Sequence, residues 1–308
     1  MTKSLMFDEP RANEFTQGTV FSCSYAENYQ NTSVFGLVIT ARCDAAQDKT
    51  QIYNYIPVVS LNDWVLADGA NIAMDRIHAD CLNTLKNLLK SESLSESLLH
   101  TKGVDEIYEA HFRHKENDGR SATRCQKMKS AMEAYKENKK HRASCDSIEA
   151  RRDHLKANAT KMESVVKELT DNRLAGFYLL QQMPTLSGAS GNYVALLCEI
   201  HHIPTSLVRE IVAGLSKDVW VSRNDKRMRC PRFYGDDDLA APVAKLKSPW
   251  IEHLMQQFSM LFSRIGVTDN DFTSVKRSLS SIGLNEAATR RGRPPRPHEL
   301  FCMTAPSR

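Results

Sequence analysis

The chain has 308 residues, of which 41% are hydrophobic and 25% are charged. This composition excludes global disorder, because it supplies enough apolar surface for one large domain or two ordinary ones. The formal net charge of +4 does not demand a polyanionic partner, so any binding of nucleic acid must depend on local clusters of basic residues.

The cysteines and the apolar runs indicate the compartment. Eight cysteines are scattered singly, without a CxxC pair, and this pattern predicts reduced thiols. The sequence shows no apolar run of the length that a signal peptide or a membrane span needs. We therefore expect a cytoplasmic protein that does not associate with membranes.

Three segments near the start of the chain have strand character, at residues 20–25, 34–40 and 55–61. β-Branched and aromatic residues dominate them, and polar loops separate them, as in a β-meander. Proline cannot donate a backbone hydrogen bond. We therefore expect the segment that contains Pro57 to lie at a sheet edge or to begin its pairing after that residue.

The periodicity becomes helical beyond Trp64. Apolar spacing predicts an amphipathic helix over residues 74–90 and a second helix over residues 104–111. Residues 120–156 are polar, basic and rich in helix-forming residues, with only sparse apolar positions. They predict a long helical arm that packs on one side only.

Strand character returns at residues 177–180 and 193–200. Helices are expected over residues 206–215, capped by Ser206, and from Pro249 onward. A last helix, capped by Asp269 or Asp271, is expected through Ile282. Three strands cannot close a sheet alone, so the simplest assembly joins the early and late strands in one sheet.

These elements define an α+β fold class with four parts. We expect the first half of a β-barrel in residues 1–68 and a helical arm inserted at residues 69–172. The second half of the barrel and the C-terminal helices would occupy residues 173–284, followed by a flexible basic tail at residues 285–308.

The order of elements resembles that of the PemK/MazF-like toxins. The matching stretches are the strand after Gly18, the apolar strand that ends at Thr40, the Val-Pro-like strand at residues 56–60, the strand and turn at residues 197–204, and the hydrophobic-Gly-hydrophobic step at residues 265–267. The resemblance covers the two ends of the chain and leaves out the arm. It implies a small SH3-like β-barrel of N- and C-terminal strands, interrupted by a long basic α-helical insertion.

The same resemblance bears on activity. The family's catalytic arginine ordinarily precedes the second strand, and residues 30–35 contain none. Residues 39–44, ITARCD, also resemble a motif of uncharacterised bacterial proteins found beside phage-defence genes. We therefore expect a non-enzymatic accessory component of a bacterial phage-defence or toxin–antitoxin-like system. Its expected partners are a protein encoded nearby, DNA or RNA, and a second copy of the chain is a further possibility.

The alternative function is that of a divergent endoribonuclease. Arg42 and Asp44 follow an apolar strand, where a guanidinium could hold a phosphate and a carboxylate could have a lowered pKa. In that case Arg42 would stabilise the phosphorane charge, and Asp44 or His201 would transfer protons. We favour the simpler interpretation that Arg42 and Asp44 hold the loop in place.

Metal-capable side chains gather in one turn, at Cys198, Glu199, His201 and His202. A zinc site normally has four ligands with paired spacing, and adjacent histidines on a strand point to opposite sides. We therefore expect a polar turn that holds neither a metal nor a cofactor. The sequence also lacks a GxSxG nucleophile motif and a phosphate-binding loop.

Basic residues of the arm and of a later loop could follow a nucleic-acid backbone. The candidates are Lys139, Lys140, Arg142, Arg227 and Arg229. Acidic residues alternate with the basic ones along the arm, so a solvated helical hairpin or a surface for a protein partner explains the pattern equally well.

The tail contains RRGRPPRP at residues 290–297, which resembles an AT-hook. In such a motif an extended Gly-Arg-Pro core lies in a narrow A·T minor groove, where arginines read the negative potential. The candidate DNA-binding residues are Arg290, Arg291, Gly292, Arg293 and Pro294. The equally simple alternative is an Arg/Pro-rich linker.

Overall fold

A computed structural model describes residues 5–11, 13–46, 50–116, 119, 121–143, 148–223, 228–235 and 238–262. Eight strands of this part of the chain form one sheet, in the order β1-β10-β2-β3-β4-β6-β5, with β7 also paired to β4. Their bounds are β1 (Phe7–Asp8), β2 (Thr19–Phe21), β3 (Phe35–Val38), β4 (Ile52–Ser60), β5 (Phe177–Pro184), β6 (Ser190–Leu196), β7 (His201–Pro204) and β10 (Pro242–Leu246). Two short strands, β8 (Leu215–Ser216) and β9 (Leu239–Ala240), pair separately.

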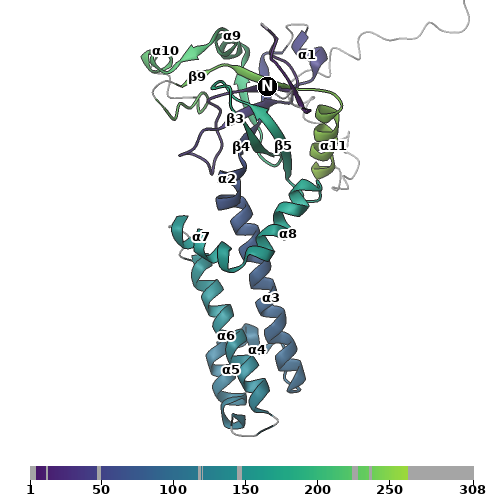
Figure 1. The fold of residues 1–308 in the computed structure, drawn as a ribbon, viewed down its shortest axis with the longest axis vertical. Helices are drawn as coiled ribbons and strands as arrows, with labels where there is room; N and C mark the ends of the chain where they lie inside the picture. Colours follow the sequence, from purple (N-terminus) through teal and green to yellow (C-terminus); the bar gives the residue numbers. More distant parts are fainter. Residues whose placement is uncertain are drawn as a thin grey trace, which may run out of the picture. The chain divides into compact units, whose positions relative to one another are not determined.

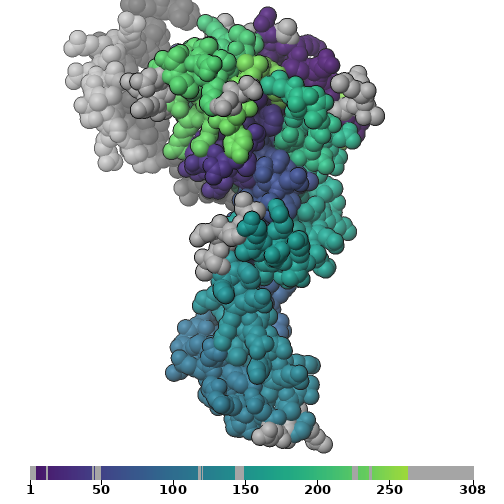
Figure 2. Space-filling model, turned by 60° about the vertical axis from the view of Figure 1, so that its left-hand side comes forward, coloured from purple at the N-terminus to yellow at the C-terminus, as the bar shows by residue number. Residues whose placement is uncertain are grey.

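The prediction that early and late strands share one sheet is confirmed. β4 pairs with β3 on one side and with β6 and β7 on the other, all antiparallel. At the two ends of the strand order, the backbone N–H of Gln181 in β5 donates to Met6 Sδ beside β1 at 3.2 Å. The sheet is therefore nearly closed and barrel-like, and Figure 2 shows purple N-terminal atoms adjoining green atoms from beyond residue 200.

Pro57 lies in the middle of a central strand, so its expected place at a sheet edge was wrong. Ile39 N donates to Asn54 O across the β3–β4 ladder at 2.9 Å. Because backbone donors alternate along a strand, the Pro57 nitrogen points away from β3. On that side the pairing of β4 with β7 stops at Tyr55, opposite His201, and its pairing with β6 starts at Val58, opposite Ala195. Pairing with β6 thus starts after Pro57, as expected, and the proline occupies a position where no N–H is needed.

Two further predictions on local structure needed correction. The strand expected over residues 193–200 ends at Leu196, where Glu199 N donates back to Leu196 O in a turn that leads to β7. Helix α9 (Thr205–Ala213) begins after Pro204, and no described side chain caps it, so Ser206 is not its cap. β1 and β10 were missed because they are short and their composition is mixed.

The chain between β4 and β5 is helical, as predicted. It consists of α2 (Leu61–Trp64), the π-helical turn Val65–Gly69, α3 (Ala70–Ser91), α4 (Leu98–Thr101), α5 (Val104–His111), a 3-10 turn (Arg113–Lys115), α6 (Ala122–Ala143), α7 (Ile148–Ala157) and α8 (Ala159–Thr170). Figure 1 shows α3, α5 and α6 side by side. None of the helices in the described ranges has the length and apolar character that crossing a bilayer requires.

The helical region contains two apolar cores. One lies between α3, α5 and α6 and includes Leu85, Phe112 and Met128. The other joins α3 and α8 to the sheet around Trp64 and Val165. Each core forms where the narrow apolar stripe of one helix packs against a neighbouring helix or the sheet, because a single stripe cannot bury itself.

Acidic side chains of the preceding helices pair with basic residues of α6. Arg124 lies 3.1 Å from Glu92, Arg142 lies 2.7 Å from Asp75, and Lys136 pairs with Asp105. Part of the positive charge of the arm is therefore matched within the arm itself.

Helices that follow the late strands cover the sheet. Helix α11 (Trp250–Phe262) begins next to Pro249 and packs Ile251 and Leu254 into the core of the sheet. Helix α9 packs Leu207 and Ile211 against Tyr53 and Tyr55 of β4. Two shorter helices complete the described elements, α1 (Arg42–Ala46) and α10 (Lys217–Ser222).

Candidate functional site

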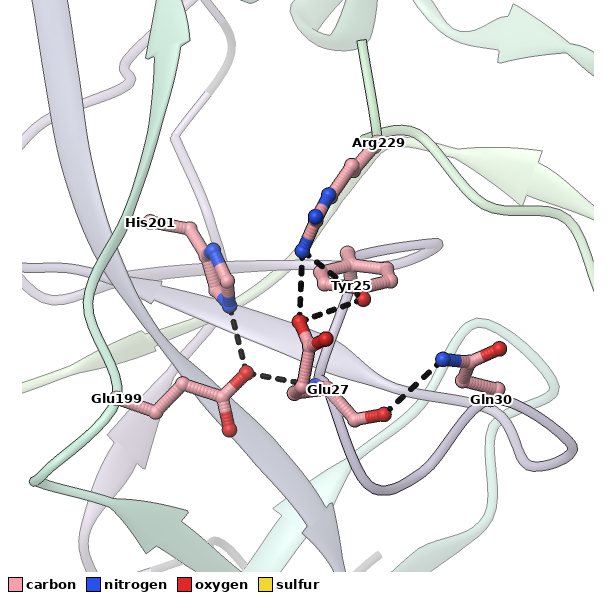
Figure 3. A network of polar contacts seen from close by, with 6 residues as sticks. All are labelled: Tyr25, Glu27, Gln30, Glu199, His201 and Arg229. Atoms are coloured by element: carbon pink, nitrogen blue, oxygen red, sulfur yellow. Dashed lines mark hydrogen bonds and ion pairs between the residues drawn. The ribbon is translucent and has the colours of Figure 1, made fainter.

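A network of polar side chains joins three segments that are distant in the sequence (Figure 3). Tyr25 and Glu27 come from the loop after β2, and Glu199 and His201 come from the turn into β7. Arg229 comes from residues 228–235. The segments meet because β7 pairs with β4 with His201 opposite Tyr55, which brings the turn beside the loop after β2.

Glu199 is the centre of the first half of this network. Its Oε1 atom accepts the backbone N–H of Glu27 at 2.7 Å and lies 2.6 Å from His201 Nε2. The side chains of His201 and Glu199 are 21% and 22% exposed. The imidazole ring lies between the rings of Tyr25 and Tyr55, with centroid distances of 5.2 and 5.6 Å. Glu199 therefore fixes both the loop backbone and the orientation of the histidine.

Tyr25, Glu27 and Arg229 form the second half. The Tyr25 hydroxyl donates to Glu27 Oε2 at 2.8 Å, and Arg229 Nη1 donates to the same oxygen at 2.7 Å. The guanidinium also lies over the Tyr25 ring, 5.3 Å from its centroid, which is favourable for a cation–π contact. Acceptance of the hydroxyl by Glu27 raises the pKa of Tyr25, and the same hydrogen bond lowers the pKa of Glu27.

What this network can do chemically depends on how its charged groups are paired. Each carboxylate faces a basic group, Glu199 with His201 and Glu27 with Arg229. Such charge-assisted pairs hold loops on a rigid sheet. The geometry thus suits the positioning of surface loops and leaves one acid–base pair, His201 and Glu199.

Replacing Glu199 with alanine is expected to destabilise the fold by about 1–3 kcal/mol, because the backbone N–H of Glu27 and the ring of His201 lose their shared acceptor. Denaturant unfolding would measure this cost. The exposed Glu163 of α8 is a suitable control, and Glu163→Ala should cost under about 0.5 kcal/mol. Equal costs for the two substitutions would contradict a structural role for the network.

A groove lies next to the network. The backbone N–H of Arg232 donates to Cys23 O at 2.7 Å, so residues 228–235 pass over the loop after β2. The groove measures about 530 Å³ and is bounded by Ser33, Thr185, Ser187, Tyr234 and Leu239. We call it the loop groove.

The loop groove contains Cys23, which has a positive φ of 59°. Burial, followed by the charge of Asp238, raises the pKa of its thiol to about 12. At neutral pH it is therefore a thiol and not an activated thiolate nucleophile.

The structure places Arg42 at the start of α1. Its guanidinium is 52% exposed and lies 3.6 Å from Glu252 of α11. Asp44 belongs to the same helix, but its side chain lies outside the described residues. In the described part of the chain, no hydrogen bond, ion pair or ring contact joins Arg42 to His201.

The other predicted residues are dispersed. Lys139 and Lys140 are exposed near the end of α6, and Arg142 pairs with Asp75. Arg227 and the tail residues Arg290, Arg291, Gly292, Arg293 and Pro294 lie outside the described residues. The structure therefore brings together His201 and Arg229, which sequence reasoning assigned to different functions.

Sequence reasoning missed Tyr25 and Glu27 and regarded Glu199 only as a metal-capable group. The short spacing of Glu199 and His201 was a usable signal, although Glu199 lies in the turn before β7 and not on a strand. The meeting with Tyr25 and Glu27 depends on strand pairing over more than 170 residues of sequence. Within the described ranges, no group of three or more His, Cys, Asp or Glu side chains is placed to hold a metal ion.

Comparison with protein-family models found no match, and searches of curated proteins and of solved structures found none either.

Proposed function

We propose that the chain is a non-enzymatic binding component of a bacterial phage-defence or toxin–antitoxin-like system, and that it engages a partner through its loops. The barrel-like sheet built from both ends of the chain supports the comparison with SH3-like barrels of the PemK/MazF type. The likeness of residues 39–44 to proteins beside phage-defence genes supports the cellular setting.

One observation carries the binding function. The acidic and basic groups of the candidate site are paired with one another. Arg42 does not belong to this network and lies beside Glu252 of α11. A nucleolytic site needs a cation and an acid–base group aimed at the same phosphate. Paired charges that brace loops next to a groove fit a recognition surface better.

The loop groove is the surface that we assign to the partner. Its rim has exposed apolar side chains, with Tyr234 63% and Leu186 52% exposed. Ser33 and Ser187 also line the groove. Exposed aromatic side chains such as Tyr234 are typical of protein interfaces, and part of the arm's positive charge is already matched within the arm. A protein encoded by a neighbouring gene is therefore the favoured partner.

The test is co-expression of the tagged full chain with the products of the two adjoining genes. We expect one product to copurify in a fixed ratio and Tyr234→Ala to weaken the complex by about tenfold or more, as loss of an interface anchor does. Val221→Ala is the control, because Val221 is 64% exposed on α10, away from the groove. No complex with either product, or equal weakening by both variants, would overturn the proposal.

The divergent endoribonuclease remains the second candidate because His201 has a carboxylate partner at 2.6 Å. In that case His201 would transfer the proton, and Arg229 would be the nearest cation in the network. Induced expression would then arrest growth, and His201→Gln would relieve the arrest in a protein that still folds. Growth unaffected by the unaltered chain, or arrest that persists in His201→Gln, would exclude this candidate.

A further inference from the structure

A second cavity, separate in its lining from the loop groove, measures about 620 Å³. It is lined by the segment before β2, the start of α1, strand β4 and helix α9. Its lining residues include Phe15, Arg42, Tyr53 and Arg209. Cavities of this size hold small organic ligands in proteins.

Basic groups surround this cavity. Arg42 and Arg209 line it, and Arg42 is only loosely paired, because its contact with Glu252 is 3.6 Å long and both side chains are more than half exposed. The acidic residue among the lining residues is Glu14, which lies 3.0 Å from Lys245. Lys245 is 17% exposed, and burial lowers its pKa although its pairing with Glu14 opposes this lowering. Glu14 is thus already engaged by a cation, and the guanidinium groups of Arg42 and Arg209 line the same cavity.

One wall of the cavity is aromatic and aliphatic. The rings of Phe15 and Tyr53 meet edge to face with their centroids 5.6 Å apart. Val208 and Val212 of α9 continue this wall. A ligand that fills the space therefore needs an anionic end for the arginines and a flat or apolar end for the wall.

We propose that this cavity binds a small phosphorylated ligand of nucleotide size, with the phosphate held by Arg42 and Arg209 and the ring placed against Phe15 and Tyr53. Guanidinium groups bind phosphate through paired N–H donors, which makes phosphate a better match than a single carboxylate. A free nucleotide and the 5′-phosphate end of a nucleic acid share this chemistry. The site goes beyond the proposed function, since it needs none of the loop-groove residues.

Calorimetric titration of the full chain at low salt tests the proposal with AMP, adenosine, inorganic phosphate and a 5′-phosphorylated oligonucleotide. We expect AMP to bind at least about tenfold more tightly than adenosine or phosphate, because each probe lacks one half of the recognition. Tighter binding of the oligonucleotide than of AMP would identify a nucleic-acid end as the ligand source, and the reverse would identify a free nucleotide.

The variants Arg42→Gln and Arg209→Gln should each weaken AMP binding by about tenfold or more. Arg223→Gln is the matched control, because Arg223 follows α10, pairs with Glu210 and does not line the cavity. AMP affinity that is unchanged by both cavity variants, or equal affinity for adenosine, would overturn the proposal. Thermal melting of each variant reports whether it folds, and partner copurification with Tyr234→Ala is an independent readout of the proposed function.

Discussion

Replacing Trp64 with alanine is expected to destabilise the protein by about 3–5 kcal/mol, the usual cost of removing a large buried aromatic side chain. Trp64 is fully buried at the end of α2. Its ring meets Phe177 of β5 at 5.3 Å, and it shares a core with Met162 of α8 and Val194 of β6. The cavity left by the substitution would lie between the sheet and the helices, so the packing of both should be destabilised.

Trp64→Phe is the matched control. Among the described residues, the indole Nε1 of Trp64 has no hydrogen-bond partner, so phenylalanine removes an unsatisfied donor while it keeps most of the apolar volume. We expect a loss of less than about half that of Trp64→Ala. Urea unfolding followed by circular dichroism measures both. A cost below about 1 kcal/mol for Trp64→Ala would contradict the shared core.

We also expect the protein to lose stability when the pH falls below about 6.5, the usual pKa of histidine. A polar layer of His78, Asn138 and His154 lies where α3, α6 and α7 meet. The rings of His141 and His154 stack with centroids 4.4 Å apart, and Asn138 Nδ2 lies 3.5 Å from His154 Nε2. His154 is 9% exposed and Asn138 is 1% exposed.

The direction of this pH dependence follows from the lowered pKa values of His154 and His78. Burial lowers the pKa of His154, and the neighbouring His141 lowers it further, although Glu137 opposes this. Burial and Arg142 lower the pKa of His78, against the opposing effects of Asn138 and Asp75. The unfolded chain therefore binds protons more readily than the folded one. Stability is complete above about pH 6.5 and decreases as the pH falls toward the lowered values.

Hydrogen exchange at pH 7.5 and pH 5.5, corrected for the intrinsic rate, measures this effect. We expect protection to fall first in α7 and in the adjoining part of α6, while the strands keep theirs. His154→Phe should reduce the pH dependence, and His100→Gln, at an exposed position in α4, should not change it. Equal loss of protection in sheet and helices, or no dependence on His154, would contradict the prediction.

Local patterns predicted much of the fold. Continuous apolar, β-branched runs identified β3 and β4, which are buried on both faces around Val38 and Val58. The helical apolar spacing identified α3, which is buried on one face. Pairing was harder to predict. Pro57 was expected either at an edge or before the start of pairing, because proline has no backbone N–H to donate. Its actual place, opposite the gap between β7 and β6, could not be predicted because β6 comes more than 130 residues later.

The candidate site was predicted less well than the fold. His201 and Arg229 drew attention as individual residues, for their chemical type and their basic surroundings. Their meeting through Glu27 requires the loop after β2, the turn into β7 and residues 228–235 to converge. Spacing along the sequence does not predict such a long-range contact, because the register of the paired strands determines it.

The position of β4 has a consequence for biosynthesis. The partners on its second side, β6 and β7, follow the whole helical region in the chain. After β3 and β4 have left the ribosome, more than a hundred further residues must therefore be synthesised before β6 and β7 can pair with the second side of β4. Nascent chains would expose an adhesive apolar strand throughout that interval, which favours capture by chaperones and makes slow translation of the arm a hazard.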